Sequence, residues 1–191
     1  MIIVQIGCNT CEDDVFNFIK EHHNEIEMFV VIDALIDCVE KAKKVYSFLG
    51  DKLIALNCAV APVDGLFYLW YPCDEEQSGH ASLNPEHVLR HKHPKIDKIT
   101  VPCVSLNGLL NSIKSKVDRL YIDIEGFDVD VLLSLDLNRF KPDFIQYEFY
   151  HSDGTFCVGE KNTKLYKKLT SERYDINQVD EYNLNAILIK K

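Results

Sequence analysis

DRLYIDIEGFDVDVLL, residues 118–133, changes from a strand pattern to a helix pattern within about two residues. Residues 120–124 are apolar apart from Asp123, as in a strand that is buried on both faces of a sheet. After Glu125-Gly126, apolar residues recur at helical spacing. This turn places Asp123 and Glu125 at the carboxyl edge of a sheet, where open α/β folds bind their ligands. A single carboxylate there can also serve only to cap the next helix, so the rest of the sequence has to decide.

The composition is that of an ordinary globular protein, with 47% apolar and 27% charged residues among 191. A chain of this length suits one domain with a full core, which we expect to span residues 1–191. Residues 1–6 lack the basic flank and the length of a signal peptide, and no apolar run approaches the roughly 20 residues needed to cross a bilayer. We therefore expect a cytoplasmic protein with no membrane partner. The seven cysteines, an odd number, then read as reduced thiols.

The charge balance argues against nucleic acid as the main partner. The formal net charge is −9, and no basic block is longer than residues 41–44. Binding to a nucleic-acid backbone depends on Lys and Arg side chains that neutralise phosphates. A small or neutral substrate is therefore favoured.

Strands and helices are predicted to alternate along the chain. The predicted strands cover residues 2–6, 29–33, 53–60, 120–124 and 144–149. The predicted helices cover residues 15–22, 35–48 and 161–169, with others beginning near residues 106 and 127. Two final strands, 174–179 and 184–189, are joined by a short polar link and must be antiparallel. Residues 65–71 suggest an extra edge strand, and residues 100–105 a short extended piece.

Two turns before the central stretch also suggest a ligand site. Gly7 opens the turn between the first strand and an acid-rich helix start, where backbone N–H groups and the helix amino end would face a ligand. Asp33 ends the second strand, near the spacing at which an acid of a Rossmann-type fold meets ribose hydroxyls. One glycine and one acid are weak signals by themselves.

Residues 72–94 lose the periodic pattern and contain four histidines, His80, His87, His91 and His93. Loops of this length in compact domains are usually functional or disordered, so this segment is the expected lid or substrate region. The spacing of the histidines fits no standard metal site. We therefore favour a solvated surface over ligation and expect no metal.

Six short motifs resemble those of the FkbM-type family, a branch of the class I S-adenosylmethionine-dependent methyltransferases. They are IGCNTC at residues 6–11, VIDA at 31–34, NCAV at 57–60, SGHASL at 78–83, VPCVSLN at 101–107 and DRLYIDIEG at 118–126. The resemblance spans nearly the whole chain. It implies a Rossmann-like three-layer α/β sandwich, with a mostly parallel seven-stranded sheet and a C-terminal antiparallel hairpin. It also implies an O-methyltransferase that uses S-adenosyl-L-methionine and methylates a hydroxyl of a sugar, a glycan or a related small molecule.

The resemblance also implies which residues bind the cofactor. By position they are Gly7, Cys8, Asn9, Thr10, Cys11, Asp33, Ala34, Cys58, Ala59, Ser82 and Asp123. Gly7 and Asn9 would cradle the methionine moiety, and Asp33 would accept hydrogen bonds from the ribose hydroxyls. Cys58 and Ala59 would border the adenine.

The methyl group would lie near Asp123, and the candidates for the catalytic base are Asp123, Glu125, Glu148 and His151, at the ends of adjacent strands. His151 has the most suitable unperturbed pKa, but a histidine in a solvent-facing turn is an equal alternative. Glu148 could instead only order a loop. The same acids could hold a divalent ion, but no further ligand spacing supports one.

Four positions depart from the family's motifs. Gln5 replaces an acid, Cys11 a glycine, Tyr121 a lysine and Asn107 an aspartate. Weaker cofactor binding is expected, because Gln5 brings no charge to the cofactor's amino group and Cys11 has a Cβ where φ > 0 is needed. Members of the family often have a helix before the first strand that this sequence lacks, so the site is expected to be more open or to be completed by another subunit in a homo-oligomer.

Two alternatives remain. The departures at Gln5, Cys11 and Tyr121 allow a catalytically degenerate binding protein with the same fold. Cys8 and Cys11 form a Cys-x-x-Cys between a strand and a helix start, where the helix dipole would lower a thiol pKa, which allows a thiol-redox protein.

Overall fold

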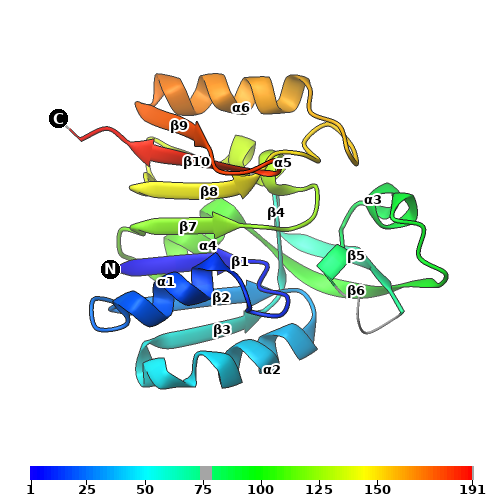
Figure 1. Cartoon of the computed structure of the whole chain (residues 1–191), viewed down its shortest axis with the longest axis horizontal. Helices are drawn as coiled ribbons and strands as arrows, with labels where there is room; N and C mark the ends of the chain where they lie inside the picture. The colour runs from blue at the N-terminus through cyan, green and yellow to red at the C-terminus, as the bar shows by residue number, and fades with distance from the viewer. Residues whose placement is uncertain (74–78, 191) are drawn as a thin grey trace.

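The computed structural model describes residues 1–73 and 79–190, and its centre is a seven-stranded sheet (Figure 1). The strand order is β3-β2-β1-β7-β8-β10-β9. The strands are β1 (Ile2–Ile6), β2 (Met28–Asp33), β3 (Leu53–Asn57), β7 (Arg119–Ile122), β8 (Phe144–Glu148), β9 (Tyr174–Gln178) and β10 (Asn183–Leu188). The first five are paired in parallel, and β10 is antiparallel to both β8 and β9. The predicted mostly parallel sheet with a C-terminal antiparallel hairpin is therefore confirmed.

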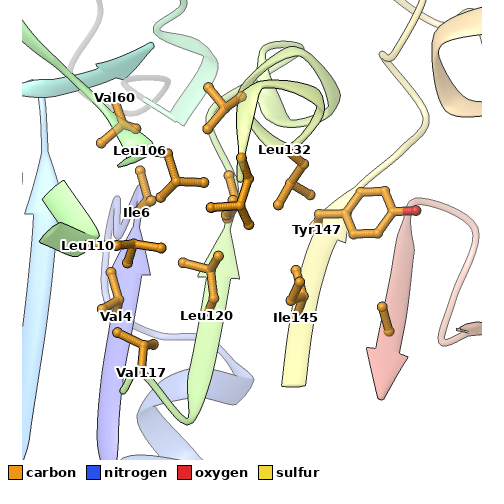
Figure 2. Packing of buried hydrophobic residues seen from close by; sticks show 14 of the residues in the cluster. Val4, Ile6, Val60, Leu106, Leu110, Val117, Leu120, Leu132, Ile145 and Tyr147 are labelled. Carbon is orange, nitrogen blue, oxygen red and sulfur yellow. The ribbon is translucent and has the colours of Figure 1, made fainter. Parts of the chain in front are cut away.

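Helices cover both faces of this sheet, because successive residues of the central strands point to opposite faces. The helices α4 (Leu106–Ile113), α5 (Asp128–Ser134) and α6 (Glu160–Ser171) contribute to the core on one face. Figure 2 shows this core, in which Val4 and Leu120 from the strands meet Leu110 and Leu132 from the helices.

The opposite face is covered by α1 (Asp14–His22), α2 (Ile36–Val45) and the 3-10 helix η1 (Ser47–Lys52). Its core contains Ile3 and Phe29 from the strands, which pack with Ile19 of α1 and Ala42 of α2. Val4 lies between Val30 and Leu120 in register, so the apolar residues of neighbouring strands share a face. The three-layer sandwich predicted from the sequence is therefore confirmed.

A second sheet of three strands was not predicted. It consists of β4 (Ala59–Ala61), β5 (Gly65–Pro72) and β6 (Ile96–Ser105), in the order β4-β6-β5. The predicted strand 53–60 is divided into β3 and β4, because the Asn57 side chain donates to the carbonyl oxygens of Asp33 and Ala34 at 3.1 and 3.0 Å and the chain turns there. The predicted extended piece at residues 100–105 is the end of the ten-residue strand β6.

The segment between β5 and β6 was predicted as a loop, but it contains the helix α3 (Pro85–Arg90). Asn84 caps this helix by accepting a hydrogen bond from the Glu86 N–H at 3.1 Å, and Pro85 occupies its first turn. Residues 74–78 of the predicted lid lie outside the described residues. Figure 1 shows β5, β6 and α3 beside one end of the seven-stranded sheet.

The hairpin turn between β9 and β10 is held by Asp180, whose Oδ1 accepts from the N–H groups of Tyr182 and Asn183 at 2.7 Å each.

Within residues 1–73 and 79–190, no helix combines the length and the apolar character that a membrane span requires.

Candidate cofactor and active site

A cavity of about 270 Å³ opens where β1, β2 and β7 end. Its wall includes all the residues that the sequence pointed to for the cofactor. They are Gly7, Cys8, Asn9, Thr10, Cys11, Asp33, Ala34, Cys58, Ala59, Ser82 and Asp123. These residues come from five separate segments, so the fold brings the motifs together at one place.

Gly7 allows the loop after β1 to lie directly against the end of β7. Its φ is +79°, and a Cβ at this position would lie 1.7 Å from the carbonyl oxygen of Asp123. The Gly7 N–H also donates to the carbonyl oxygen of Ile32 at 2.9 Å. Only glycine tolerates both this φ and this approach of two backbones.

Asp33 organises the same loop. Its Oδ2 accepts from the backbone N–H groups of Cys8 and Asn9 at 3.0 and 3.3 Å, and its Oδ1 accepts from the Leu35 N–H at 2.9 Å. Oδ2 also accepts from the Cys8 thiol at 3.5 Å, whereas Oδ1 accepts only from Leu35 among the described residues, so a lone pair of Oδ1 remains for a ligand hydroxyl. Asp33 therefore has a structural role beside the predicted binding role, and the sequence did not reveal it.

Asp13 is a cavity residue that the sequence interpretation missed. The buried Gln5, 2% exposed, donates from Nε2 to Asp13 Oδ2 at 2.8 Å and receives the Tyr46 hydroxyl at 3.4 Å. The other oxygen of Asp13 caps α1 by accepting from the Phe16 N–H at 2.8 Å. Asp13 therefore brings a carboxylate to the wall although Gln5 has replaced the family's acid. In the sequence, the acid-rich start of the first helix was the signal that could have identified Asp13.

Other wall residues were also missed. They are Ile6, Glu12, Ile32, Leu35, Cys38, Val60, Leu69, Gly79, Ala81, Leu83, Ile124 and Phe127. Most are apolar, and a buried apolar residue in the sequence does not indicate whether it faces a core or a cavity.

Cys11 takes the left-handed conformation that the motif's glycine would take, with φ +57°. Its side chain is 1% exposed, and Cys8 beside it is 3% exposed. The hydrogen bond between the two thiols, together with burial, raises the pKa of Cys8, and the same bond lowers the pKa of Cys11. Such enclosure opposes the thiol-redox alternative, because a reactive thiol needs access for its partner.

The other two departures from the motifs lie away from the cavity wall described above. Tyr121 packs in the core under α1, where its hydroxyl accepts from Arg119 Nη1 at 3.0 Å. Asn107 joins α4 to the segment after α5, donating to the Ser134 carbonyl oxygen and accepting from the Asp136 N–H, both at 2.8 Å. Neither substitution therefore alters the cavity.

Asp123 and Glu125 bring two carboxyl groups to the cavity wall. The Asp123 side chain is open to the cavity, but the walls shield it from bulk water, and this desolvation and the neighbouring Glu125 raise its pKa. Burial also raises the pKa of Glu125. Behind them, Asp128 ties the ends of β7 and β8 together by accepting from the N–H groups of Ile124 and Glu148 at 3.3 and 3.4 Å.

Glu148 and His151, the other two catalytic candidates, are not among the described residues that line the cavity. His151 Nε2 lies 3.4 Å from Glu148 Oε1, and the two side chains are 6% and 12% exposed. The solvent-facing turn considered for His151 is therefore wrong. Burial raises the pKa of Glu148 to about 10, which makes it a neutral hydrogen-bonding group rather than a base near pH 7.

The prediction that the four histidines of residues 72–94 form a solvated surface was also wrong. His87 is 0% exposed, and its Nε2 lies 2.8 Å from Glu125 Oε2. His80, His91 and His93 are half-buried. The cause is the helix α3, which folds this segment back onto the turn after β7, where Ser82 Oγ donates to the Glu125 carbonyl oxygen at 2.7 Å.

Comparison with known proteins gives a consistent result. The family described as "Methyltransferase FkbM domain" matches residues 6–182. Among solved structures, methyltransferase FkbM from Methylobacillus flagellatus KT has a TM-score of 0.57 and 12% identity, over 97% of this chain and 43% of that chain. The SAH-bound methyltransferase PaMTH1 from Podospora anserina has a TM-score of 0.53 and 10% identity, over 99% of this chain and 72% of that chain. The chain thus spans less than half of the first structure, and both likenesses show a shared fold. No curated protein matches the sequence.

Proposed function

Because the chain belongs to the FkbM methyltransferase family, we propose that it transfers a methyl group from S-adenosylmethionine to a hydroxyl of a small molecule or glycan. S-adenosylmethionine is the cofactor that this family implies, and when bound it supplies an electrophilic methyl group on a sulfonium. One observation carries the proposal. The motif residues from five segments line a single cavity at the carboxyl edge of the sheet, with Asp123 open to it.

The groups on the cavity wall fit the cofactor part by part. The Asp13 carboxylate suits the ammonium group of the amino acid end. The free lone-pair capacity of Asp33 suits the ribose hydroxyls. Apolar side chains, among them Ala34, Ala59 and Leu83, suit the flat face of adenine.

Asp123 is the residue that we assign to the acceptor. Its side chain would accept the hydrogen bond of the acceptor hydroxyl, orient the oxygen, and take the proton that this oxygen loses when its bond to the methyl carbon forms and the S–C bond breaks. Glu125 lies beside Asp123 on the same wall. Glu148 and His151 do not line the cavity, so we assign them no direct contact with the acceptor. A neutral acceptor suits a protein with a formal net charge of −9 better than a nucleic acid does.

The test separates binding from turnover. Calorimetric titration with S-adenosylhomocysteine should give one site per chain, and a mass-spectrometric screen with S-adenosylmethionine should find a methylated product among hydroxylated small molecules and glycans. Absence of binding by folded protein would contradict the proposal. Binding without transfer to any acceptor would support the degenerate binding protein instead.

A further inference from the structure

Three histidines and one glutamate meet just beyond the cavity wall. His87, His91, Glu125 and His151 each offer one possible ligand atom, and these atoms all lie within 4.8 Å of one another. We propose that this histidine–glutamate cluster binds a divalent transition-metal ion, with His87, His91 and Glu125 as its ligands. The proposal goes beyond methyl transfer and does not depend on it.

The cluster is assembled from three parts of the chain. His87 lies on α3, and His91 caps its C-terminal end, so the two rings are four residues apart and share one side of the helix. Glu125 lies in the turn after β7, and His151 in the loop after β8. Two histidines at this spacing on a helix are a known arrangement for a transition metal. The spacing fits no standard metal site as a linear pattern, and it is the unpredicted helix α3 that brings the two rings together.

Close packing fixes the turn that carries Glu125. Glu125 itself has φ +53° and Gly126 has φ +89°. A Cβ on Gly126 would lie 3.3 Å from His87 Nδ1 and 3.5 Å from the Cβ of His151. The three segments therefore meet with little free space, which is the condition for a preformed site.

The nitrogen atoms of the cluster are suited to a metal. His91 Nε2 is buried and has no hydrogen-bond partner within residues 1–73 and 79–190. A buried polar atom without a partner is unfavourable, so a ligand for this nitrogen is expected. A neutral imidazole ring has one lone pair on nitrogen that a metal ion can accept.

Second contacts orient the ligands. His87 Nε2 faces Glu125 Oε2 at 2.8 Å, while its Nδ1 lies 3.4 Å from the Thr155 hydroxyl. When one ring nitrogen of a histidine binds a metal, the other commonly forms a hydrogen bond, as His87 Nδ1 can with Thr155. Imidazole and carboxylate together favour zinc, iron or nickel over magnesium or calcium.

The size of the cluster is also suitable. Ligand atoms about 2.0–2.1 Å from a tetrahedral zinc ion lie about 3.4 Å from one another. The ligand atoms of the cluster lie within 4.8 Å of one another, and His87 Nε2 and Glu125 Oε2 are 2.8 Å apart, so this pair would separate slightly and the longer distances would shorten when a metal binds.

His151 has a different role in this arrangement. Its Nδ1 accepts from the Phe156 N–H at 2.8 Å, so the hydrogen of the neutral ring is on Nε2, which faces Glu148 at 3.4 Å. That nitrogen has no free lone pair for a metal. Three protein ligands would then leave one coordination position for water or another oxygen.

The test uses the full chain without a histidine tag, stripped of metal with a chelator and checked for folding by circular dichroism. Titration with Zn²⁺ should give one ion per chain, and Co²⁺ should give the visible absorption of a nitrogen- and oxygen-bound ion. Zn²⁺ should also raise the melting temperature. Absence of binding by the folded protein would overturn the proposal.

Variants identify the ligands. His91→Ala and Glu125→Gln should each weaken Zn²⁺ binding by at least about 10–100-fold and remove the gain in melting temperature. His93→Ala is the matched control, because His93 lies in the same segment but outside the cluster, and it should bind Zn²⁺ like the unmodified chain. Equal loss in the control, or no loss in the two ligand variants, would overturn the assignment.

Discussion

Gln5→Glu restores the acid that the family's motif usually has at this position, yet we expect it to destabilise this protein. Gln5 is 2% exposed and donates to Asp13 at 2.8 Å. The substitution removes a hydrogen bond to a charged group, worth about 1.5–3 kcal/mol, and places two carboxylates together. At this separation and an effective dielectric constant of about 20, the repulsion would reach about 6 kcal/mol, and uptake of a proton by the pair limits it.

We therefore expect the free energy of unfolding to fall by about 3 kcal/mol, which corresponds to a loss of about 6–12 °C in melting temperature for a domain of this size. Urea denaturation followed by circular dichroism measures this change. Asp13→Asn is the control, because asparagine also caps a helix, and its Nδ2 can donate to Gln5 Oε1 once the Gln5 amide turns over and Nε2 donates to the Tyr46 hydroxyl instead, so its cost should stay below about 1 kcal/mol.

The double variant makes the reasoning refutable. In Gln5→Glu/Asp13→Asn, the introduced amide can donate to the introduced carboxylate, and stability should return to within about 1 kcal/mol of the unmodified protein. A Gln5→Glu variant as stable as the original, or a double variant no more stable than Gln5→Glu alone, would show that the carboxylate of Asp13 does not depend on Gln5.

Three further substitutions test the site. Gly7→Ala should lower the free energy of unfolding by on the order of 3 kcal/mol or prevent folding, because its Cβ would meet the Asp123 carbonyl oxygen. Gly50→Ala is the control, because Gly50 has φ +56° but no atom within 4 Å of an added Cβ, and denaturant titrations should show a loss of only about 1–2 kcal/mol. Asp33→Ala should weaken S-adenosylhomocysteine binding by about 1.5–3 kcal/mol in calorimetry at a temperature where the variant is folded, and unchanged affinity would remove Asp33 from the binding site. Asp123→Asn should lower the methyl-transfer rate by about 10²-fold while cofactor affinity stays within a few-fold, and full turnover would refute its assignment to the acceptor.

The sequence by itself determined the seven-stranded sheet and the position of the cofactor cavity. Buried parallel strands appear as short apolar runs, and their ends are marked by Asp33 and Asp123, because a charge rarely interrupts such a run without reason. The carboxyl ends of parallel strands share one edge, so the motifs that follow them had to meet there. These signals are local in the sequence and are repeated from strand to strand.

Only the tertiary structure decided which partners these residues have. Gln5 depends on Asp13 and Tyr46, and the second sheet depends on the pairing of β4, β5 and β6 across some forty residues of chain. The histidines of residues 72–94 carry no apolar period, so nothing local places them inside. They are enclosed because a short capped helix folds onto the turn at Glu125, and such long-range contacts depend on packing that no single stretch of sequence contains.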